Sequence, residues 1–129
     1  MPDGIVLDTS ILVDFRRRVP SAGTYVMGLL GKREALTHPV CAAELLEGAR
    51  DRADFRDLQR FLIAFRRVAV KAGDFQRCLE LMDQHRLSHG IGWADCLIAA
   101  TCIRLRLPLA TLNDRHFSPV GGLRVLRPY

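Results

Sequence analysis

The sequence predicts an α/β fold in which a short, mainly parallel sheet is covered by helices on both faces. Short apolar runs alternate along the chain with longer segments of helical periodicity, and this alternation is typical of parallel strands joined by crossover helices. The first apolar run ends abruptly at a polar residue, Asp8, as a buried parallel strand does at its carboxyl end. No repeat, linker or low-complexity segment interrupts the 129 residues, a length typical of one domain.

The first half of the chain is expected to alternate between short strands and helices. Two short apolar runs, at 5–7 and 35–37, are expected to be buried strands. Apolar residues at helical spacing predict a helix over 22–30, and a proline in the first turn suits a helix over 39–48. A stronger apolar stripe predicts a helix over 55–65. Acidic residues near its start and arginines near its end complement the helix dipole.

The second half continues the same alternation. We expect strands at 68–70, 109–111 and 123–126, because each is a short apolar run between helical or turn segments. Apolar positions at core spacing predict a helix over 94–105, which Pro108 ends. A loop with the sequence HGIG separates it from the preceding helix. That preceding helix is marked by Phe75, Cys78, Leu79 and Met82.

The composition is that of an ordinary globular protein. Apolar residues make up 49% and charged residues 26% of the chain, which excludes an intrinsically disordered protein. The N-terminal segment has no basic region before its apolar run, and no apolar stretch is long enough to span a membrane. We therefore expect a cytoplasmic location. The four cysteines form no CxxC pair and are expected to be buried free thiols.

The charge balance is basic and suggests a class of partner. The net charge of +5 rests on 17 arginines and two lysines. Such a balance favours a polyanionic partner, either nucleic acid or an acidic protein. The arginines are dispersed, and the run of three at 16–18 is interpreted as the solvated end of a helix. Charge alone does not decide between the two partners.

Polar residues that can carry chemistry occur at four points of this pattern. Each has an ordinary structural interpretation as a helix cap, a dipole partner, a solvent-facing residue or a turn residue. Parallel strands, however, end at one edge of a sheet, and ligands bind there. Carboxylates gathered at that edge repel one another, and a hard cation such as Mg²⁺ or Mn²⁺ relieves the repulsion. The residues are Asp8, Glu44, Asp95 and the pair Asn113 and Asp114.

Four blocks of the sequence resemble PIN-domain ribonucleases, specifically the VapC toxins of bacterial type II toxin–antitoxin systems. The blocks are IVLDTSILVD, AELLEG, WADCLIAATCIRLRLPLATLNDRHF and GLRVLRPY, and they span essentially the whole chain. The resemblance implies a single PIN domain over 1–129 with an α/β/α sandwich fold. It also implies an Mg²⁺- or Mn²⁺-dependent endoribonuclease, a cognate VapB-like antitoxin, and a homodimer or a heteromeric toxin–antitoxin complex with no membrane association.

The resemblance also assigns the first site residues by position. Asp8 matches the first acid of the family, Glu44 the second and Asp95 the third. The hydroxyl that follows the first acid falls at Thr9 or Ser10, and it is expected to orient the substrate. Each of these positions carries the acidic residue that the family has there, so we expect the three-acid core of the site to be intact.

The fourth acid departs from the family pattern. Members often carry an aspartate two residues after the threonine, but here that position is Asn113 and the carboxylate follows at Asp114. A neutral amide oxygen is a weaker ligand of Mg²⁺ than a carboxylate. We therefore expect Asp114, in preference to Asn113, to complete the site. The departure leaves open whether one or two metal ions bind.

The expected chemistry is hydrolysis of a phosphodiester bond by water that a metal ion activates. Asp8, Asp95 and the corner at 113–114 would hold the metal, and Glu44 would bind metal or orient the water. Nearby Arg115 would offset the charge that grows on the phosphate in the transition state. The resemblance implies products with a 3′-hydroxyl and a 5′-phosphate.

Other interpretations of the sequence are a non-catalytic module and two further enzyme classes. A PIN-fold interaction module that binds a protein or RNA is the main alternative. An aspartyl-phosphate phosphatase needs a second aspartate where this chain has Ser10, and no phosphate-binding glycine motif supports a nucleotide-binding enzyme. His85 and His89 have i, i+4 spacing, but Gly90 and Gly92 place that stretch at a helix end, which disfavours a zinc site there. We interpret His116 as a loop histidine and Trp93 as a core residue.

Overall fold

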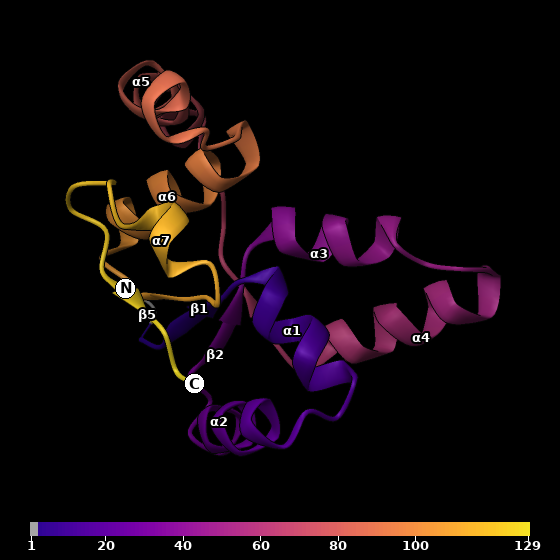
Figure 1. The fold of residues 1–129 in the computed structure, drawn as a ribbon. Coiled ribbons are helices and arrows are strands. Elements are labelled where there is room, and N and C mark those ends of the chain that lie inside the picture. The colour runs from indigo at the N-terminus through magenta and orange to yellow at the C-terminus, as the bar shows by residue number, and fades with distance from the viewer. Residues whose placement is uncertain (1–2) are drawn as a thin grey trace.

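The centre of the computed structural model, which describes residues 3–129, is a five-stranded parallel sheet (Figure 1). Its strands are β1 (Ile5–Leu7), β2 (Ala35–Thr37), β3 (Arg66–Arg67), β4 (Leu109–Ala110) and β5 (Val125–Leu126). They lie in the order β3-β2-β1-β4-β5, so the chain starts in the middle of the sheet and extends it to each edge in turn. All neighbouring pairs are parallel, which confirms the predicted sheet.

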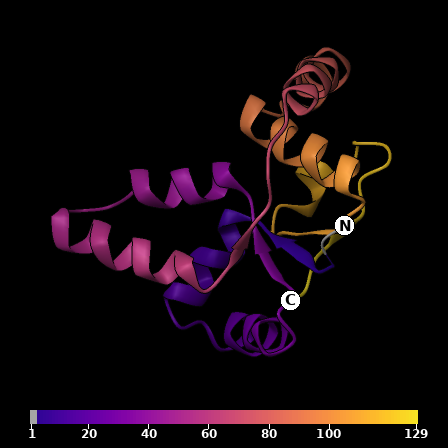
Figure 2. The same ribbon diagram turned by 180° about the vertical axis from the view of Figure 1, so that it is seen from behind.

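Helices cover both faces of this sheet and give the predicted α/β/α arrangement. Within residues 3–129 they are α1 (Thr9–Arg16), α2 (Pro20–Gly31), α3 (Pro39–Glu47), α4 (Arg52–Ile63), α5 (Ala72–His89), α6 (Trp93–Leu105) and α7 (Asp114–Phe117). In two opposite views α1 and α2 lie on one side of the sheet and α5 and α6 on the other (Figures 1 and 2). Helix α3 runs away from the sheet and α4 returns toward it. None of these helices is both long and apolar enough to cross a bilayer.

The edge strand β3 lies earlier in the chain than the sequence predicts. The expected strand at 68–70 is replaced by a strand of two exposed arginines, Arg66 and Arg67, which pair with Leu36 and Thr37 of β2. Val68 follows β3, is buried, and donates its N–H to the Thr37 carbonyl. Its apolar side chain therefore reflects packing in the core and not a position within the strand. The strands predicted at 109–111 and 123–126 are shorter than expected, because β4 ends at Ala110 and β5 begins at Val125.

Helix α5 exposes residues that the sequence pattern placed with the apolar positions of a helix. Cys78 is buried, but Phe75 and Leu79 are 53% and 67% exposed. Figure 1 shows α5 at the outside of the molecule, beside α6 and away from the sheet, so it buries one narrow face. Trp93 at the start of α6 is 59% exposed, and its interpretation as a core residue is therefore wrong.

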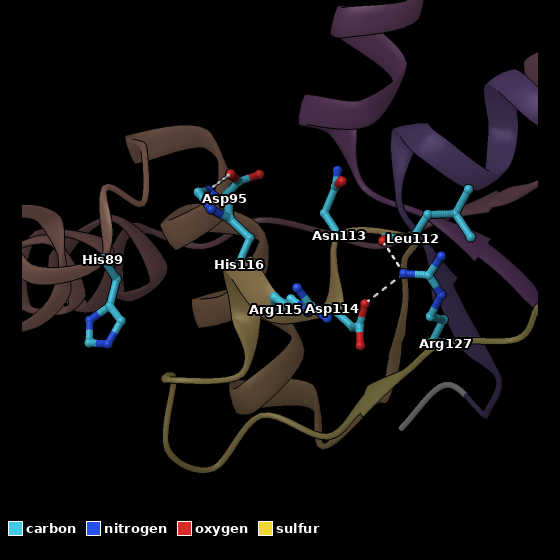
Figure 3. Close-up of a pocket in the computed structure, with 8 residues that line it drawn as sticks. All are labelled: His89, Asp95, Leu112, Asn113, Asp114, Arg115, His116 and Arg127. Carbon is cyan, nitrogen blue, oxygen red and sulfur yellow. Dashed lines mark hydrogen bonds and ion pairs between the residues drawn. The ribbon is translucent and has the colours of Figure 1, made fainter.

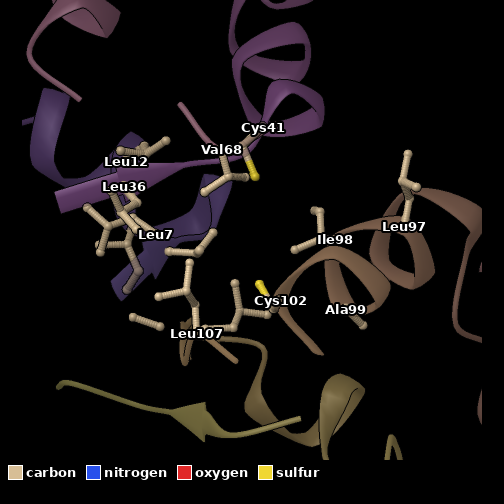
Figure 4. Packing of buried hydrophobic residues seen from close by; sticks show 14 of the residues in the cluster. Leu7, Leu12, Leu36, Cys41, Val68, Leu97, Ile98, Ala99, Cys102 and Leu107 are labelled. Carbon is tan, nitrogen blue, oxygen red and sulfur yellow. The ribbon is translucent and has the colours of Figure 1, made fainter. Parts of the chain in front are cut away.

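The hydrophobic core lies between the sheet and the helices and includes the inner strands and α6 (Figure 4). Helix α6 is buried continuously from Cys96 to Cys102, as expected of a helix that is packed on several sides. The four cysteines are free and buried, as predicted. Burial raises the pKa of Cys41 to about 12, so this thiol stays protonated and unreactive at neutral pH.

A buried polar network fixes the helices relative to one another. His38 is fully buried and caps α3, because its Nδ1 accepts the Val40 N–H at 3.0 Å. The proton then resides on Nε2, which donates to Thr101 Oγ1 of α6 at 3.0 Å. Thr101 Oγ1 lies 3.2 Å from Asp74 Oδ2, and Arg104 Nε donates to Asp74 Oδ1 at 2.7 Å. The network thus joins α3, α5 and α6, two of which carry candidate acids.

Candidate active site

Asp8 lies where β1 ends and α1 begins, and its carboxylate is 5% exposed. Its backbone carbonyl accepts the first helical hydrogen bonds, but its side chain does not cap the helix. Instead Oδ2 accepts a hydrogen bond from the Thr111 hydroxyl at 2.7 Å and a longer one from Ser10 at 3.4 Å. The Cys41 thiol lies 3.9 Å from Oδ1. The carboxylate is therefore oriented by Ser10 of α1 and by two other segments, the end of β4 and helix α3.

Glu44 projects from α3 at the mouth of a cleft of about 450 Å³ beside α1. The Thr9 hydroxyl donates to Glu44 Oε1 at 3.0 Å, which ties the first turn of α1 to the middle of α3. Partial desolvation raises the pKa of Glu44, and the charges of Asp8 and Asp95 add to the rise, while the Thr9 hydrogen bond opposes it. The glutamate therefore lies in the field of both other acids.

Asp95 lies in the first turn of α6 and lines a second cavity, of about 670 Å³. His116 Nε2 lies 2.8 Å from Asp95 Oδ2, and Figure 3 shows the two side chains in contact. Desolvation raises the pKa of Asp95, and the charge of Asp8 raises it further, whereas His116 lowers it. The histidine that the sequence marked as an ordinary loop residue thus pairs with a candidate acid.

The corner after β4 presents two polar side chains in different directions (Figure 3). Asn113 extends toward the side on which Asp95 lies, and its backbone N–H donates to the Thr111 hydroxyl at 3.0 Å. Asp114 turns the other way, and its Oδ1 accepts from Arg127 Nη1 at 3.0 Å. That contact lowers the pKa of Asp114. The amide and the carboxylate therefore have different surroundings.

The remaining predicted residues occupy the rim of the site. The Ser10 hydroxyl accepts the Leu112 N–H at 3.1 Å, so it joins α1 to the β4–α7 corner. Thr9 binds Glu44, as described above. Arg115 is exposed, lines the same cavity as Asp95, and has no carboxylate partner in the described part of the chain.

The carboxylate oxygens of Asp8, Glu44 and Asp95 are donors of the kind that a hard divalent cation binds. Asp8 raises the pKa of both Glu44 and Asp95, so the three carboxylates are close enough to repel one another. Oxygen donors whose charges repel are the ligands that Mg²⁺ and Mn²⁺ prefer. Within residues 3–129, no three acidic, histidine or cysteine side chains surround a single point closely enough to enclose an ion. The Thr9 hydroxyl and the His116 imidazole contact Glu44 and Asp95, respectively.

Sequence reasoning missed the residues that orient the acids. Thr111 was taken as the end of a strand, yet its buried hydroxyl makes the shortest contact to Asp8. Arg127 follows β5 and reaches back to Asp114 across the corner. Cys41 touches Asp8 from α3. The sequence signal that could have indicated Thr111 is its position as a polar residue at the end of a buried strand. The sequence around Cys41 and Arg127 contains no pattern that indicates what these residues contact.

Comparisons with known proteins agree on one family. A family model described as PIN domain matches residues 5–123. Ribonuclease VapC10 of Mycobacterium tuberculosis is 34% identical over 114 residues, covering 88% of this chain and 85% of that protein. Ribonuclease VapC19 of the same organism is 33% identical over 87% of this chain and 90% of its own length.

Solved structures show the same fold at lower sequence identity. A toxin–antitoxin complex from Klebsiella pneumoniae contains a chain that superposes with a TM-score of 0.79 at 22% identity, covering 98% of each chain. A VapBC2 complex from Rickettsia felis, bound to a promoter DNA fragment, gives a TM-score of 0.80 at 22% identity, covering 95% of this chain and 96% of that one. Sequence and structure comparisons therefore agree over nearly the whole chain.

Proposed function

We propose, from the premise that this chain belongs to the PIN-domain family, that it is a metal-dependent endoribonuclease and the toxin of a toxin–antitoxin pair. The observation that carries the proposal is the gathering of Asp8, Glu44 and Asp95 from three separate elements. Glu44 and Asp95 both lie in the field of Asp8, because the charge of Asp8 contributes to raising the pKa of each. A site that held no cation would have little reason to place the buried carboxylate of Asp8 near the half-buried one of Asp95 and the exposed one of Glu44.

In this proposal Asp8 and Asp95 hold Mg²⁺ or Mn²⁺. Asn113 or Asp114, the fourth residue of the site after the three acids, supplies a further donor. When bound, the cation would supply a hydroxide nucleophile near neutral pH and offset charge on the phosphate. Asn113 lies on the side of Asp95, whereas Asp114 is engaged by Arg127. These contacts favour Asn113 as the fourth donor, which reverses the preference drawn from the sequence. Either donor is compatible with the three-acid core.

The chain's own residues would position the acids and the substrate. The Thr111 hydroxyl fixes Oδ2 of Asp8, and Oδ1, which the Cys41 thiol approaches only to 3.9 Å, would face the substrate. Thr9 fixes Glu44 Oε1, which leaves Oε2 to orient the attacking water and to accept its proton. Arg115, exposed on the rim, would place a positive charge beside the phosphate as negative charge grows in the transition state. Positions that are fixed before the substrate binds need no reorganisation during the reaction.

A toxin of this kind needs an antitoxin, and the cleft beside Glu44 suits one. That cleft of about 450 Å³ lies between α1 and the α3–α4 pair, and apolar side chains, the candidate acid and three arginines, Arg16, Arg17 and Arg50, line it. Val13, Leu45 and Leu58 would contact an apolar segment, while a basic side chain of the antitoxin would pair with Glu44. Binding there would cover the site. We expect this pair to act in the cytoplasm, where cellular RNA is present.

The proposal is tested by expression in a bacterium together with an assay of the purified chain. Expression alone should stop growth, and co-expression with an antitoxin encoded next to its gene should restore growth. The purified chain should cleave RNA with Mn²⁺ and stop when EDTA is added. Normal growth with abundant folded protein, and no cleavage at any Mn²⁺ concentration, would favour the alternative of a non-catalytic interaction module.

A further inference from the structure

The cavity that Asp95 lines extends to Arg127, which follows β5 (Figure 3). Its volume of about 670 Å³ is in the range of sites that hold a small organic ligand. Asp95 and Asn113 lie on the upper side in this view, Arg115 lies below them, and Arg127 lies lower and to the right. The cavity therefore joins a candidate acid to two arginines in one continuous surface.

Arg127 is held in a fixed orientation with donors to spare. Its Nη1 donates to the Leu112 carbonyl at 2.9 Å and to Asp114 Oδ1 at 3.0 Å. A guanidinium carries five N–H donors, and no contact to Nη2 or Nε is found among residues 3–129. Asp114 thus serves as a support for Arg127, and the arginine can bind an anion without breaking that pair.

The charged side chains of this cavity suit an anionic group of a substrate whose reacting part lies at Asp95. The two carboxylates that line it are paired, Asp95 with His116 and Asp114 with Arg127. Arg115 has no carboxylate partner in the described chain. In an RNA strand the scissile phosphate has a neighbouring phosphate one nucleotide away on each side. When the scissile phosphate lies at the acids, a neighbouring phosphate therefore lies close by.

We propose that the cavity between Asp95 and Arg127 is a subsite for the nucleotide next to the scissile phosphate, and that Arg127 binds the phosphate of that nucleotide. This inference rests on the proposed ribonuclease function and adds the path of the RNA strand. The strand would leave the acids across α7 toward β5. Because Arg127 binds through charge and two parallel donors, it would contribute affinity without base preference.

The test measures how RNA affinity depends on salt. Every protein carries Asp8→Asn, so that the RNA stays uncleaved, and the probe is a fluorescein-labelled single-stranded RNA read by anisotropy across a series of KCl concentrations. The variant is Arg127→Gln. The control is Arg77→Gln on α5, because Arg77 has a similar exposed ion pair, with Glu80 at 2.9 Å and a side chain 42% exposed against 52% for Arg127.

We expect Arg127→Gln to raise the Kd about three- to tenfold, the effect of losing one partly exposed charge-assisted contact. The slope of log Kd against log salt should fall by about 0.7, because one phosphate contact to a single strand is lost. Arg127→Lys should keep the slope and recover part of the affinity, since it keeps the charge but not the paired donors. Arg77→Gln should leave both quantities unchanged.

An unchanged slope in Arg127→Gln would overturn the inference, even if the Kd rose. A purely structural role of Arg127 in the β4–α7 corner would change the affinity but not the number of phosphate contacts. An equal fall in slope for Arg77→Gln would also overturn it, since any surface arginine would then suffice. An unchanged slope with weakened binding of poly-glutamate would assign the cavity to an acidic protein. Failure of the ribonuclease proposal is separate, because it appears as an absence of Mn²⁺-dependent cleavage by the wild-type chain.

Discussion

Acidification should destabilise this protein through His38, the histidine that caps α3 inside the core. Burial lowers the pKa of His38 from 6.5 to about 4, while the nearby charge of Asp74 acts in the opposite direction. As the pH falls from about 6.5 to about 4, the unfolded chain therefore binds a proton that the folded chain does not. Stability is lost across that interval, and the loss levels off below it.

The size of the effect follows from the difference between the two pKa values. One pKa unit corresponds to about 1.4 kcal/mol, so the whole interval is worth about 3 kcal/mol at most. Between about pH 7.5 and pH 4.5 the expected loss is about 2.5 kcal/mol. A typical domain is stable by about 5–15 kcal/mol, so the loss is easily measured by urea unfolding at each pH.

The variant that isolates this effect is His38→Asn. Asparagine is a good helix cap and can accept the Val40 N–H, but it does not titrate. His38→Asn should be less stable than the wild type at neutral pH, because the contact to Thr101 is lost, yet it should lack the loss of about 2.5 kcal/mol on acidification. His89→Asn, at an exposed position, should keep the wild-type pH dependence. If His38→Asn lost as much stability on acidification as the wild type, the argument would be refuted.

Three further predictions concern the site. Thr111→Val should lower unfolding free energy by about 1–3 kcal/mol and reduce RNA cleavage, because Asp8 loses its shortest hydrogen bond, whereas Thr111→Ser should retain both. Calorimetry with Mn²⁺ should find weaker binding in Asn113→Ala than in Asp114→Asn, and the opposite order would restore Asp114 as the fourth donor. Glu44→Gln should reduce cleavage at least about 100-fold, as the loss of a general base does, while Glu47→Gln on the same helix should cleave normally.

The alternation of elements was predictable because burial leaves a local pattern in the sequence. The run Ile5–Leu7 is apolar because β1 is central in the sheet, and α6 shows apolar residues on every side because it is buried on every side. The pattern failed where burial comes from tertiary packing. Val68 is apolar because it packs in the core rather than because it pairs in a strand, and Leu79 is apolar although α5 turns it outward.

The candidate acids were predictable for a different reason from the residues that orient them. Asp8 stands out because a charge after an apolar strand is unusual, and its position along the chain fixes its position at the sheet edge. Thr111 touches it from 103 positions away, and His38 meets Thr101 from 63 positions away. No local pattern encodes such pairs. The direction of Asp114 depends in the same way on Arg127, which a different strand brings beside it.

The central claim, that the gathered acids form a metal-dependent ribonuclease site, is tested most directly by RNA cleavage with Asp95→Asn at saturating Mn²⁺. The control is Asp83→Asn on α5, an exposed aspartate outside the site. Circular dichroism should confirm that both variants are folded. We predict that Asp83→Asn cleaves at the wild-type rate and that Asp95→Asn has no measurable activity. Cleavage by folded Asp95→Asn at the wild-type rate would contradict the account.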